Sequence, residues 1–384
     1  MKNQQKGKSL VGIYGGAFDP VHDSHIQIMR LAIRELNLTR LVVVPSGHAP
    51  HKTTQTSFEK RVEMLRLATA DMPEVVIDTI ESLVKTTAYS AMILPLLAQK
   101  YGKIIHIIGG DSLIDMPTWY CPERVMRFPH AVIPRGEITP KFEDALLYAI
   151  TNWSANVQVI RNACAPIASS EIRCGYRIGI YPQAKPPVPA PVASYIAQHG
   201  LYSEYAHIVD WLKEWLGESR FAHTQQVALM ALRLNRQLHL PEEQVIQAAL
   251  LHDCAKDLNF VDPHIPQECR QEAVVHAFNG ACIAQKQFHI YNVEVLDAIR
   301  YHTTGRAEMT PLEKLIYTAD YCEETRRHPG AETARQIALE DFEKGFLWVV
   351  RESYRYLIEN VSKESRCPLS EDCYRYYYSQ GENK

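Results

Sequence analysis

The C-terminal half of the chain contains several side chains that commonly bind metal ions. A single histidine on an apolar helix face is more often a hydrogen-bonded core residue than a ligand, so the argument depends on the whole set. His252 lies seven and four residues after Val245 and Ala248, a spacing that places all three on one face of a helix. Asp253 has the same spacing from the apolar residues one position further on, so both side chains are predicted to point inward. The full set is His223, His252, Asp253, His276, His302 and Asp320.

Buried carboxylates in this set would need compensating partners. No stripe of lysine or arginine shares the predicted helix faces, so a bound cation is the simplest explanation. Imidazole and carboxylate ligands without cysteine suit iron, manganese or cobalt, and zinc less specifically. The sequence therefore predicts a metal site in this half.

A second group of residues, near the N-terminus, could bind phosphate. The string GGAFDPVHDSH at 15–25 follows a β-rich run and precedes a helical pattern. Two glycines let the backbone approach a triphosphate, and the start of a helix offers free N–H groups and a positive dipole end. His22 and His25 are three residues apart on the first helical turn, so both rings can face one ligand. Imidazoles there could stabilise phosphate charge during an in-line displacement.

The elements that must position these groups differ between the two halves. In the first half, β-rich runs alternate with helical patterns, which predicts a doubly wound α/β fold with a parallel sheet. The runs are 10–14, 41–44, 75–78, 104–108 and 131–134. A proline-dense stretch at 180–191 is predicted to be extended.

Beyond residue 202 the pattern is helical with almost no strand signal, so the second domain is predicted to be all-α. Its first helical runs are 205–215, 223–238 and 241–256. The tail at 362–384 is polar and rich in tyrosine. Cys367 and Cys373 there lack the spacing and partner ligands of a zinc site, so no such site is predicted.

The string at 15–25 resembles the GG-x-FDP-x-H-x-G-H signature of nucleotidyltransferases of the nicotinate mononucleotide adenylyltransferase type. Further matches follow in the family's order at 44–52 (VP…PHK), 61–68 (R-x-x-M-x-x-x-A), 109–119 (G-x-D…W), 135–136 (R-x-G-like) and 168–173 (SS-T-x-IR). The segment 192–202 is similar to the family's closing helix, which places the domain border after Tyr202 and gives domains 1–202 and 203–384.

This resemblance implies an adenylyl transfer from Mg-ATP to nicotinate mononucleotide, with nicotinamide mononucleotide as the open alternative. It implies that His22, His25 and Arg173 are catalytic. It also implies that Gly110 and Asp111 hold adenosine and that Trp119 stacks on the nicotinate ring. The complete nucleotide-binding set is Gly15, Gly16, Ala17, Lys52, Tyr89, Gly110, Asp111, Trp119, Arg135, Ser169 and Ser170.

Three positions depart from the family's pattern. Ser24 stands where the family has glycine, Ala17 replaces a threonine or serine donor, and Ala168 replaces the first serine of the second motif. Each change removes or crowds a contact but leaves the two histidines and the arginine in place, so we expect catalysis to survive. The alternative is that one half only binds nucleotide and regulates the other.

The order H…HD…H…H…D resembles the HD superfamily in its version with two metals. The resemblance implies that His223, His252, Asp253 and Asp320 hold one metal, with iron expected first and manganese or cobalt as alternatives. It implies that Asp253, also a catalytic residue, bridges to a second metal held by His276 and His302.

The segments 249–256, 276–281, 298–303 and 319–326 look like those of bacterial HD hydrolases that split diadenosine tetraphosphate symmetrically into two ADP. Lys256, Arg300 and Arg326 are candidates to neutralise the polyphosphate. A nucleoside phosphate or a guanosine alarmone remains an alternative substrate. Together the two resemblances predict a bifunctional enzyme.

Composition limits the other classes of function. With 384 residues, 46% hydrophobic and 22% charged, the chain is typical of two globular domains. A net charge of −3 argues against nucleic-acid binding, and no apolar run approaches bilayer length. The basic start lacks the apolar region of a signal peptide, so we expect a cytoplasmic protein, and nine scattered cysteines indicate reduced thiols. The expected partners are small nucleotides, and the sequence leaves assembly into a homo-oligomer open.

Overall fold

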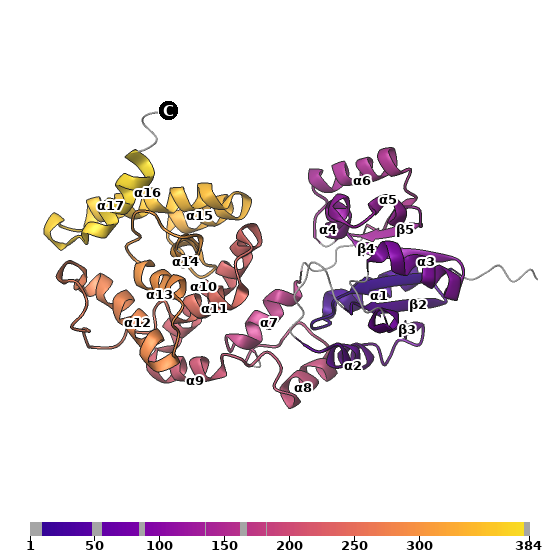
Figure 1. The fold of residues 1–384 in the computed structure, drawn as a ribbon, viewed down its shortest axis with the longest axis horizontal. Coiled ribbons are helices and arrows are strands. Elements are labelled where there is room, and N and C mark those ends of the chain that lie inside the picture. Colours follow the sequence, from indigo (N-terminus) through magenta and orange to yellow (C-terminus); the bar gives the residue numbers. More distant parts are fainter. Residues whose placement is uncertain are drawn as a thin grey trace, which may run out of the picture. The chain divides into compact units, whose positions relative to one another are not determined.

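The computed structural model describes residues 10–47, 56–83, 89–134, 136–161, 167–181 and 183–379. It divides into two compact units, the first formed by Met1–Arg173 with Pro186–Leu201 and the second by Cys174–Lys185 with Tyr202–Lys384. Figure 1 shows strands only among the earlier elements and only helices from α9 onward. The domain border after Tyr202 stays a prediction, and the structure adds that residues 174–185 pack with the second unit.

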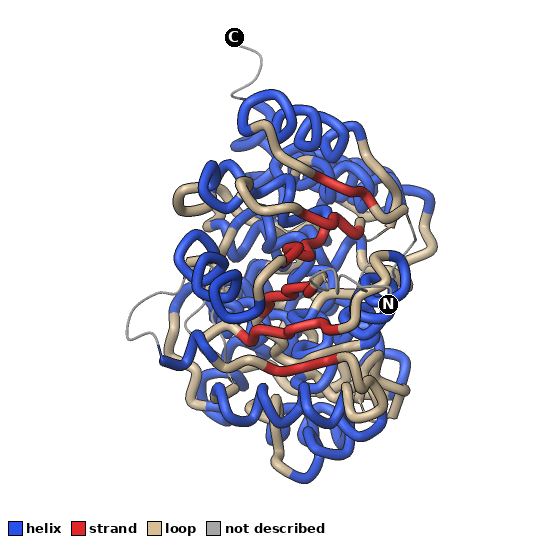
Figure 2. The backbone as a smooth tube through the Cα atoms, turned by 90° about the vertical axis from the view of Figure 1, so that its right-hand side faces the viewer, coloured by secondary structure: helices blue, strands red, loops and turns tan. Residues whose placement is uncertain are grey.

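The first unit is built on a six-stranded sheet in the order β3-β2-β1-β4-β5-β6, with every neighbouring pair parallel. The strands lie side by side in Figure 2. They are β1 (Val11–Gly16), β2 (Arg40–Pro45), β3 (Val75–Ile77), β4 (Ile104–Gly109), β5 (His130–Ile133) and β6 (Val157–Val159). This confirms the predicted doubly wound fold. In such sheets ligands bind at the carboxyl ends of the strands where the order reverses, which here is between β1 and β4.

Helices cover the sheet because its central strands are apolar on both faces. β2 and β4 consist almost entirely of buried residues, as expected for strands inside a parallel sheet. The helical elements up to Gln198 are α1 (Asp23–Glu35), α2 (Phe58–Ala68), η1 (Ile80–Leu83), α3 (Ser90–Tyr101), α4 (Gly110–Asp115), η2 (Met116–Thr118), α5 (Pro122–Val125), α6 (Pro140–Trp153), α7 (Ser169–Arg177) and α8 (Ala190–Gln198). The border between the two units falls within α7.

The described part of the second unit is helical, which confirms the predicted all-α domain. Its elements are α9 (Ala206–Trp215), α10 (Glu218–Leu238), α11 (Glu242–Leu251), η3 (Gln267–Cys269), α12 (Glu272–Phe288), α13 (Val293–Tyr301), α14 (Pro311–Cys322), α15 (Pro329–Glu340), α16 (Phe342–Asn360), η4 (Lys363–Ser365) and α17 (Pro368–Ser379). Across the described residues, no helix is both long and apolar enough to cross a bilayer.

Two local differences from the sequence prediction matter. The helix expected over 241–256 ends at Leu251, and a turn follows. The tyrosine-rich tail contains α17, whose Tyr374, Tyr377 and Tyr378 pack against the core of the second unit. An amphipathic arrangement of aromatic residues thus gives this segment an apolar face that its polar composition obscures.

Candidate functional sites

The turn between β1 and α1 brings the two N-terminal histidines together. His22 caps the start of α1, and its backbone N–H donates to Nδ1 of His25 across 3.3 Å. The two rings stack with their centroids 3.7 Å apart. His25 also meets the ring of Phe18 edge-on at 5.0 Å, while His22 is 1% exposed. The two imidazoles that the spacing places on one helical turn therefore lie against each other.

The second predicted phosphate motif reaches the same turn from the other end of the unit. Arg173 on α7 donates from Nη1 to the carbonyl oxygen of Asp19 at 2.8 Å. The hydroxyl of Ser169, the first residue of α7, donates to the carbonyl of Pro20 at 3.2 Å. Two segments about 150 residues apart in sequence thus converge on one loop. Ser170 lies in the same first turn of α7.

The other predicted nucleotide-binding residues lie near the neighbouring strand or outside the described residues. Gly110 and Asp111 open α4 directly after β4, the strand next to β1. A side chain at Gly110 would lie 3.2 Å from the ring of Phe142, so this glycine permits close packing. Gly15 and Gly16 end β1, and Trp119 packs on the core. The ring of Tyr89 lies tilted against that of Tyr120 with 4.6 Å between centroids. Lys52 and Arg135 lie outside the described residues.

The three departures from the family's pattern have different surroundings. Ser24 is fully buried in α1, and within the described part of the chain its hydroxyl oxygen has no hydrogen-bond partner. The carbonyl of Ala17 accepts a hydrogen bond from Arg61. The carbonyl of Ala168 accepts the amides of Glu171 and Ile172 and so begins α7 without a side-chain cap.

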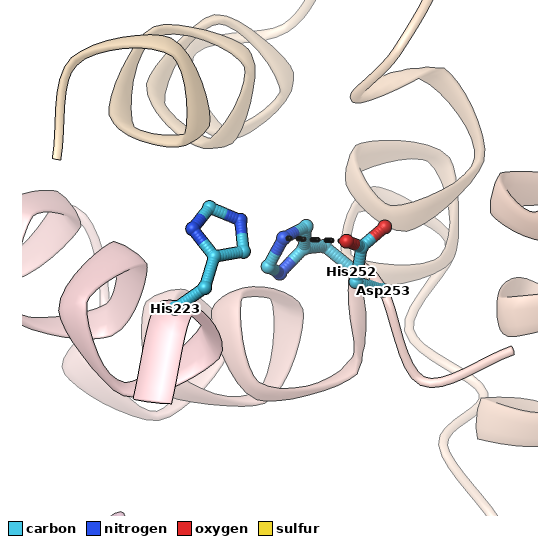
Figure 3. A group of neighbouring side chains, drawn as sticks. All are labelled: His223, His252 and Asp253. Atoms are coloured by element: carbon cyan, nitrogen blue, oxygen red, sulfur yellow. Dashed lines mark ion pairs between the residues drawn. The ribbon is translucent and has the colours of Figure 1, made fainter. Parts of the chain in front are cut away.

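In the second unit, the six predicted ligands converge from five segments. His223 lies on α10, His252 and Asp253 follow α11, His276 lies on α12, His302 follows α13 and Asp320 lies on α14. Figure 3 shows the rings of His223 and His252 side by side, with the carboxylate of Asp253 next to His252. Ligand atoms within 4.8 Å of one another form three groups: His223, His252 and Asp253; His252, His302 and Asp320; and Asp253, His276 and His302.

Asp253 lies between two sets of histidines. Its Oδ1 atom is 3.1 Å from Nε2 of His276 and 3.4 Å from Nε2 of His302. Its Oδ2 atom is 4.0 Å from Nε2 of His252. On that second side, Nε2 of His223 is 2.9 Å from Oδ1 of Asp320. One carboxylate therefore faces two separate ligand groups.

Backbone hydrogen bonds fix two of these histidines in one tautomer. Nδ1 of His252 donates to the carbonyl of Ala249 at 2.7 Å, and Nδ1 of His302 donates to the carbonyl of Ile299 at 2.8 Å. This leaves Nε2 with its lone pair directed at the cluster, as in metal-bound histidines. Nε2 of His252 is buried and has no hydrogen-bond partner among the described residues. Such an orphaned atom beside carboxylates fits a bound cation.

Charge in the cluster also suits a cation. Burial lowers the pKa of His252 to about 4, although the neighbouring carboxylates oppose this shift. Burial likewise lowers the pKa of His276 to about 4, so both rings are neutral and able to ligate near pH 7. Burial raises the pKa of Asp253, but the adjacent histidines outweigh it and hold the pKa well below its ordinary value.

Basic side chains do reach the cluster, contrary to the expectation from the helix faces. Nη2 of Arg326 is 2.7 Å from Oδ1 of Asp320, and Nη1 of Arg220 is 3.6 Å from Oδ2 of Asp253. Lys256 lies 2.9 Å from Nε2 of His276. These residues come from the first turn of α10 and from turns after α11 and α14, so they were not visible in the periodic stripes. Arg300 instead pairs with Asp297.

Glu323 is a functional candidate that the sequence argument did not include. Its carboxylate is fully buried and accepts a hydrogen bond from Nδ1 of His223 at 3.2 Å. Burial lowers the pKa of His223, but the bonds to Asp320 and Glu323 outweigh it and raise the pKa to about 9. Glu323 lies three residues after Asp320, one helical turn on, and this spacing was the available signal.

The comparisons with known proteins divide the chain in the same way. Residues 13–175 match the family described as cytidylyltransferase-like, and residues 220–325 match the HD domain. A probable nicotinate-nucleotide adenylyltransferase/Ap4A hydrolase from Mycoplasma pneumoniae is 26% identical over 82% of this chain and 89% of its own length. A probable nicotinate-nucleotide adenylyltransferase from Thermomicrobium roseum is 32% identical over 50% of this chain and 92% of its own.

A solved structure is also similar to part of this chain. A predicted HD superfamily hydrolase involved in NAD metabolism from Clostridium acetobutylicum is 31% identical over 46% of this chain and 98% of its own, with a TM-score of 0.42. The HD domain implies binding of divalent metal, and the His/Asp groups described above are candidate sites for it. Through its N-terminal half the chain belongs to the nicotinate-nucleotide adenylyltransferase family, and it carries an HD domain in its C-terminal half.

Proposed function

We propose that this chain is a bifunctional enzyme. Its first unit transfers the adenylyl group of ATP to nicotinate mononucleotide, and its second unit hydrolyses diadenosine tetraphosphate symmetrically to two ADP. The convergence of His22, His25 and Arg173 on one turn supports the first activity. The position of Asp253 between two histidine groups supports the second. The M. pneumoniae relative, whose name contains both activities, aligns with most of the chain.

In the first reaction, a phosphate oxygen of the mononucleotide attacks the α-phosphorus of Mg-ATP, and the bond to the β-phosphate breaks to release pyrophosphate. The two imidazoles and the Arg173 guanidinium stabilise charge on the transferring phosphates. By the family resemblance, Gly110 and Asp111 hold adenosine and Trp119 stacks on the pyridine ring. The other residues assigned to nucleotide binding in this proposal are Gly15, Gly16, Ala17, Lys52, Tyr89, Arg135, Ser169 and Ser170.

In the second site, His223, His252, Asp253 and Asp320 would hold one metal, and Asp253, His276 and His302 would hold another. Iron is the metal we expect, with manganese or cobalt as alternatives. A bound pair of metals supplies a nucleophilic hydroxide at neutral pH and a clamp for phosphate. The chain's own contribution is to orient His223 through Glu323 and to neutralise polyphosphate charge through Lys256 and Arg326. We assign Arg300 to the same phosphate role from the resemblance alone.

Product analysis tests both activities. The full chain, purified with and without exclusion of air, is incubated with diadenosine tetraphosphate, with and without added iron or manganese, and the products are separated by chromatography. ADP as the sole metal-dependent product is expected. AMP with ATP, or no turnover, would contradict the proposed substrate and cut.

For the first unit, ATP is supplied with nicotinate or nicotinamide mononucleotide, and formation of dinucleotide and pyrophosphate is measured. Faster turnover of the nicotinate form is expected. Preference for the amide would reverse the choice of acceptor, and absence of both products would contradict adenylyl transfer.

A further inference from the structure

Arg61 on α2 is a buried cation to which the proposed reaction assigns no role. Its side chain is 1% exposed. Its Nη1 donates to the carbonyl of Ala17 at 2.6 Å, its Nη2 to the carbonyl of Ser46 at 2.8 Å and its Nε to the carbonyl of Thr56 at 3.2 Å. These carbonyls belong to the turn after β1, the residue that follows β2 and the segment before α2. One planar guanidinium therefore joins three separate segments, which a lysine ammonium cannot do with the same geometry.

The bond to Ala17 sets the direction of a backbone donor in the phosphate-binding turn. In a trans peptide the carbonyl and the following N–H point in opposite directions. When Arg61 holds the carbonyl of Ala17, the N–H of Phe18 is directed away from Arg61. Phe18 has a φ of 50°, a left-handed conformation that is unfavourable for a bulky residue and persists only when its surroundings enforce it. The hydrogen bond from Arg61 to Ala17 is one of the contacts that hold Phe18 in this conformation.

The peptide between Ser46 and Gly47 is held at both its carbonyl and its N–H. The carbonyl of Ser46 accepts from Arg61, and the following N–H, of Gly47, donates to Oε2 of Glu81 at 3.0 Å. A side chain at position 47 would lie 2.8 Å from the carbonyl oxygen of Glu81, so glycine is needed for this approach. The N–H of Ser46 donates to the carbonyl of Gly16 at 2.9 Å, which ties this peptide to the phosphate turn.

We propose that Arg61 is a positioning residue for adenylyl transfer, which orients the Phe18 amide toward the ATP phosphates by holding the carbonyl of Ala17. Arg61 acts through the backbone and does not touch the substrate. This inference rests on the proposed function, since it takes the β1–α1 turn as the ATP phosphate site. Loss of a hydrogen bond from an amide to a charged group weakens binding about tenfold or more.

The test compares Arg61→Lys with the parent full chain and with Arg66→Lys. Arg66 lies on the same helix, and its side chain is 63% exposed, so the same exchange there is a matched control. Arg61→Lys is expected to raise the KM for ATP about tenfold or more, with a change of less than about threefold in the KM for the mononucleotide. Arg66→Lys is expected to retain the parent values. A purely structural defect would lower the fraction of enzyme that is active and would not change the KM for ATP more than the KM for the mononucleotide.

Parallel changes in both KM values, or an unchanged KM for ATP in a folded Arg61→Lys protein, would overturn the inference. If Arg61→Lys fails to fold by circular dichroism, Arg61→Gln, which buries no charge, replaces it in the same comparison. The equilibrium affinity for ATP is measured alongside the kinetics. A parent that binds ATP but transfers no adenylyl group refutes the proposed reaction, whereas the ratio of ATP affinities still tests the role of Arg61.

Discussion

The first unit should lose stability in mild acid because of a buried histidine pair. Nδ1 of His130 on β5 donates to the carbonyl of Phe128 at 2.7 Å, and its Nε2 accepts from Nδ1 of His106 on β4 at 3.2 Å. Both histidines are buried, His130 completely. Burial lowers the pKa of His130 from 6.5 to about 4, although the bond to Phe128 opposes part of this shift. Burial also lowers the pKa of His106, and the neighbouring ring adds to the effect.

Proton uptake by the unfolded chain sets the direction of this pH effect. Between pH 4 and 6.5 the unfolded chain binds a proton at position 130 that the folded unit does not, so stability falls as pH falls through this window. Above about pH 6.5 the free energy of unfolding is not reduced by protonation at position 130. It is lower by about 2 kcal/mol at pH 5 and by about 3 kcal/mol below pH 4. His130→Gln does not titrate, so its free energy of unfolding should fall by about 2 kcal/mol less between pH 7.5 and pH 5.

Methionine oxidation by peroxide during a urea titration reports the unfolding of the first unit separately. Met29 and Met64 are fully buried in this unit and become open to oxidation only when it unfolds. Mass spectrometry then gives the urea midpoint of this unit at each pH. His199→Gln changes an exposed histidine of the same unit and should behave like the parent. An equal loss of stability in the parent and in His130→Gln would refute the reasoning.

Three further predictions concern the two sites. His252→Ala combined with Asp253→Ala should abolish hydrolysis of diadenosine tetraphosphate and leave adenylyl transfer intact in paired assays of one preparation; loss of both would indicate global unfolding or obligatory coupling. Glu323→Gln should lower metal affinity about 10–100-fold, because the charge that orients His223 is lost. Metal content after dialysis against graded metal concentrations measures the affinity, and an affinity equal to that of the parent would contradict the orienting role. Ser24→Gly should raise kcat/KM for adenylyl transfer if the buried serine crowds the β1–α1 turn. A parent that already turns over rapidly would show that the serine does not crowd this turn.

The sequence was most informative where a function depends on neighbours in the chain. The string containing His22 and His25 predicted a turn with both rings on one side, and the structure has the turn with the two rings against each other. Arg173 could be connected with that turn only through a family resemblance, because nothing in local periodicity joins residues 154 positions apart. β6 was missed because it is a three-residue edge strand with an exposed glutamine at its centre, which gives no hydrophobic run.

In the second unit, helical periodicity identified the histidines and carboxylates that point inward. It did not identify the basic side chains that pair with them. Arg220, Lys256 and Arg326 lie at helix starts or in turns, where spacing carries no information about direction. Arg220 reaches Asp253 from another helix, whereas Lys256 and Arg326 pair with carboxylates a few residues away through turns. The structure therefore changes the argument for a metal. The carboxylates alone do not require one, whereas the orphaned Nε2 of His252 and the fixed tautomers favour one.

The turn that follows the early end of α11 brings a cation to the cluster. After Leu251 the chain tightens, since the amide of Cys254 donates to the carbonyl of Leu251 at 3.3 Å and the amide of Lys256 to that of Asp253 at 3.0 Å. These three-residue steps stack side chains more nearly above one another than a helix does. They also bring the Lys256 ammonium to 3.7 Å from Oδ1 of Asp253. The turn at the end of the helix, rather than the helix face, therefore places this ammonium beside Asp253.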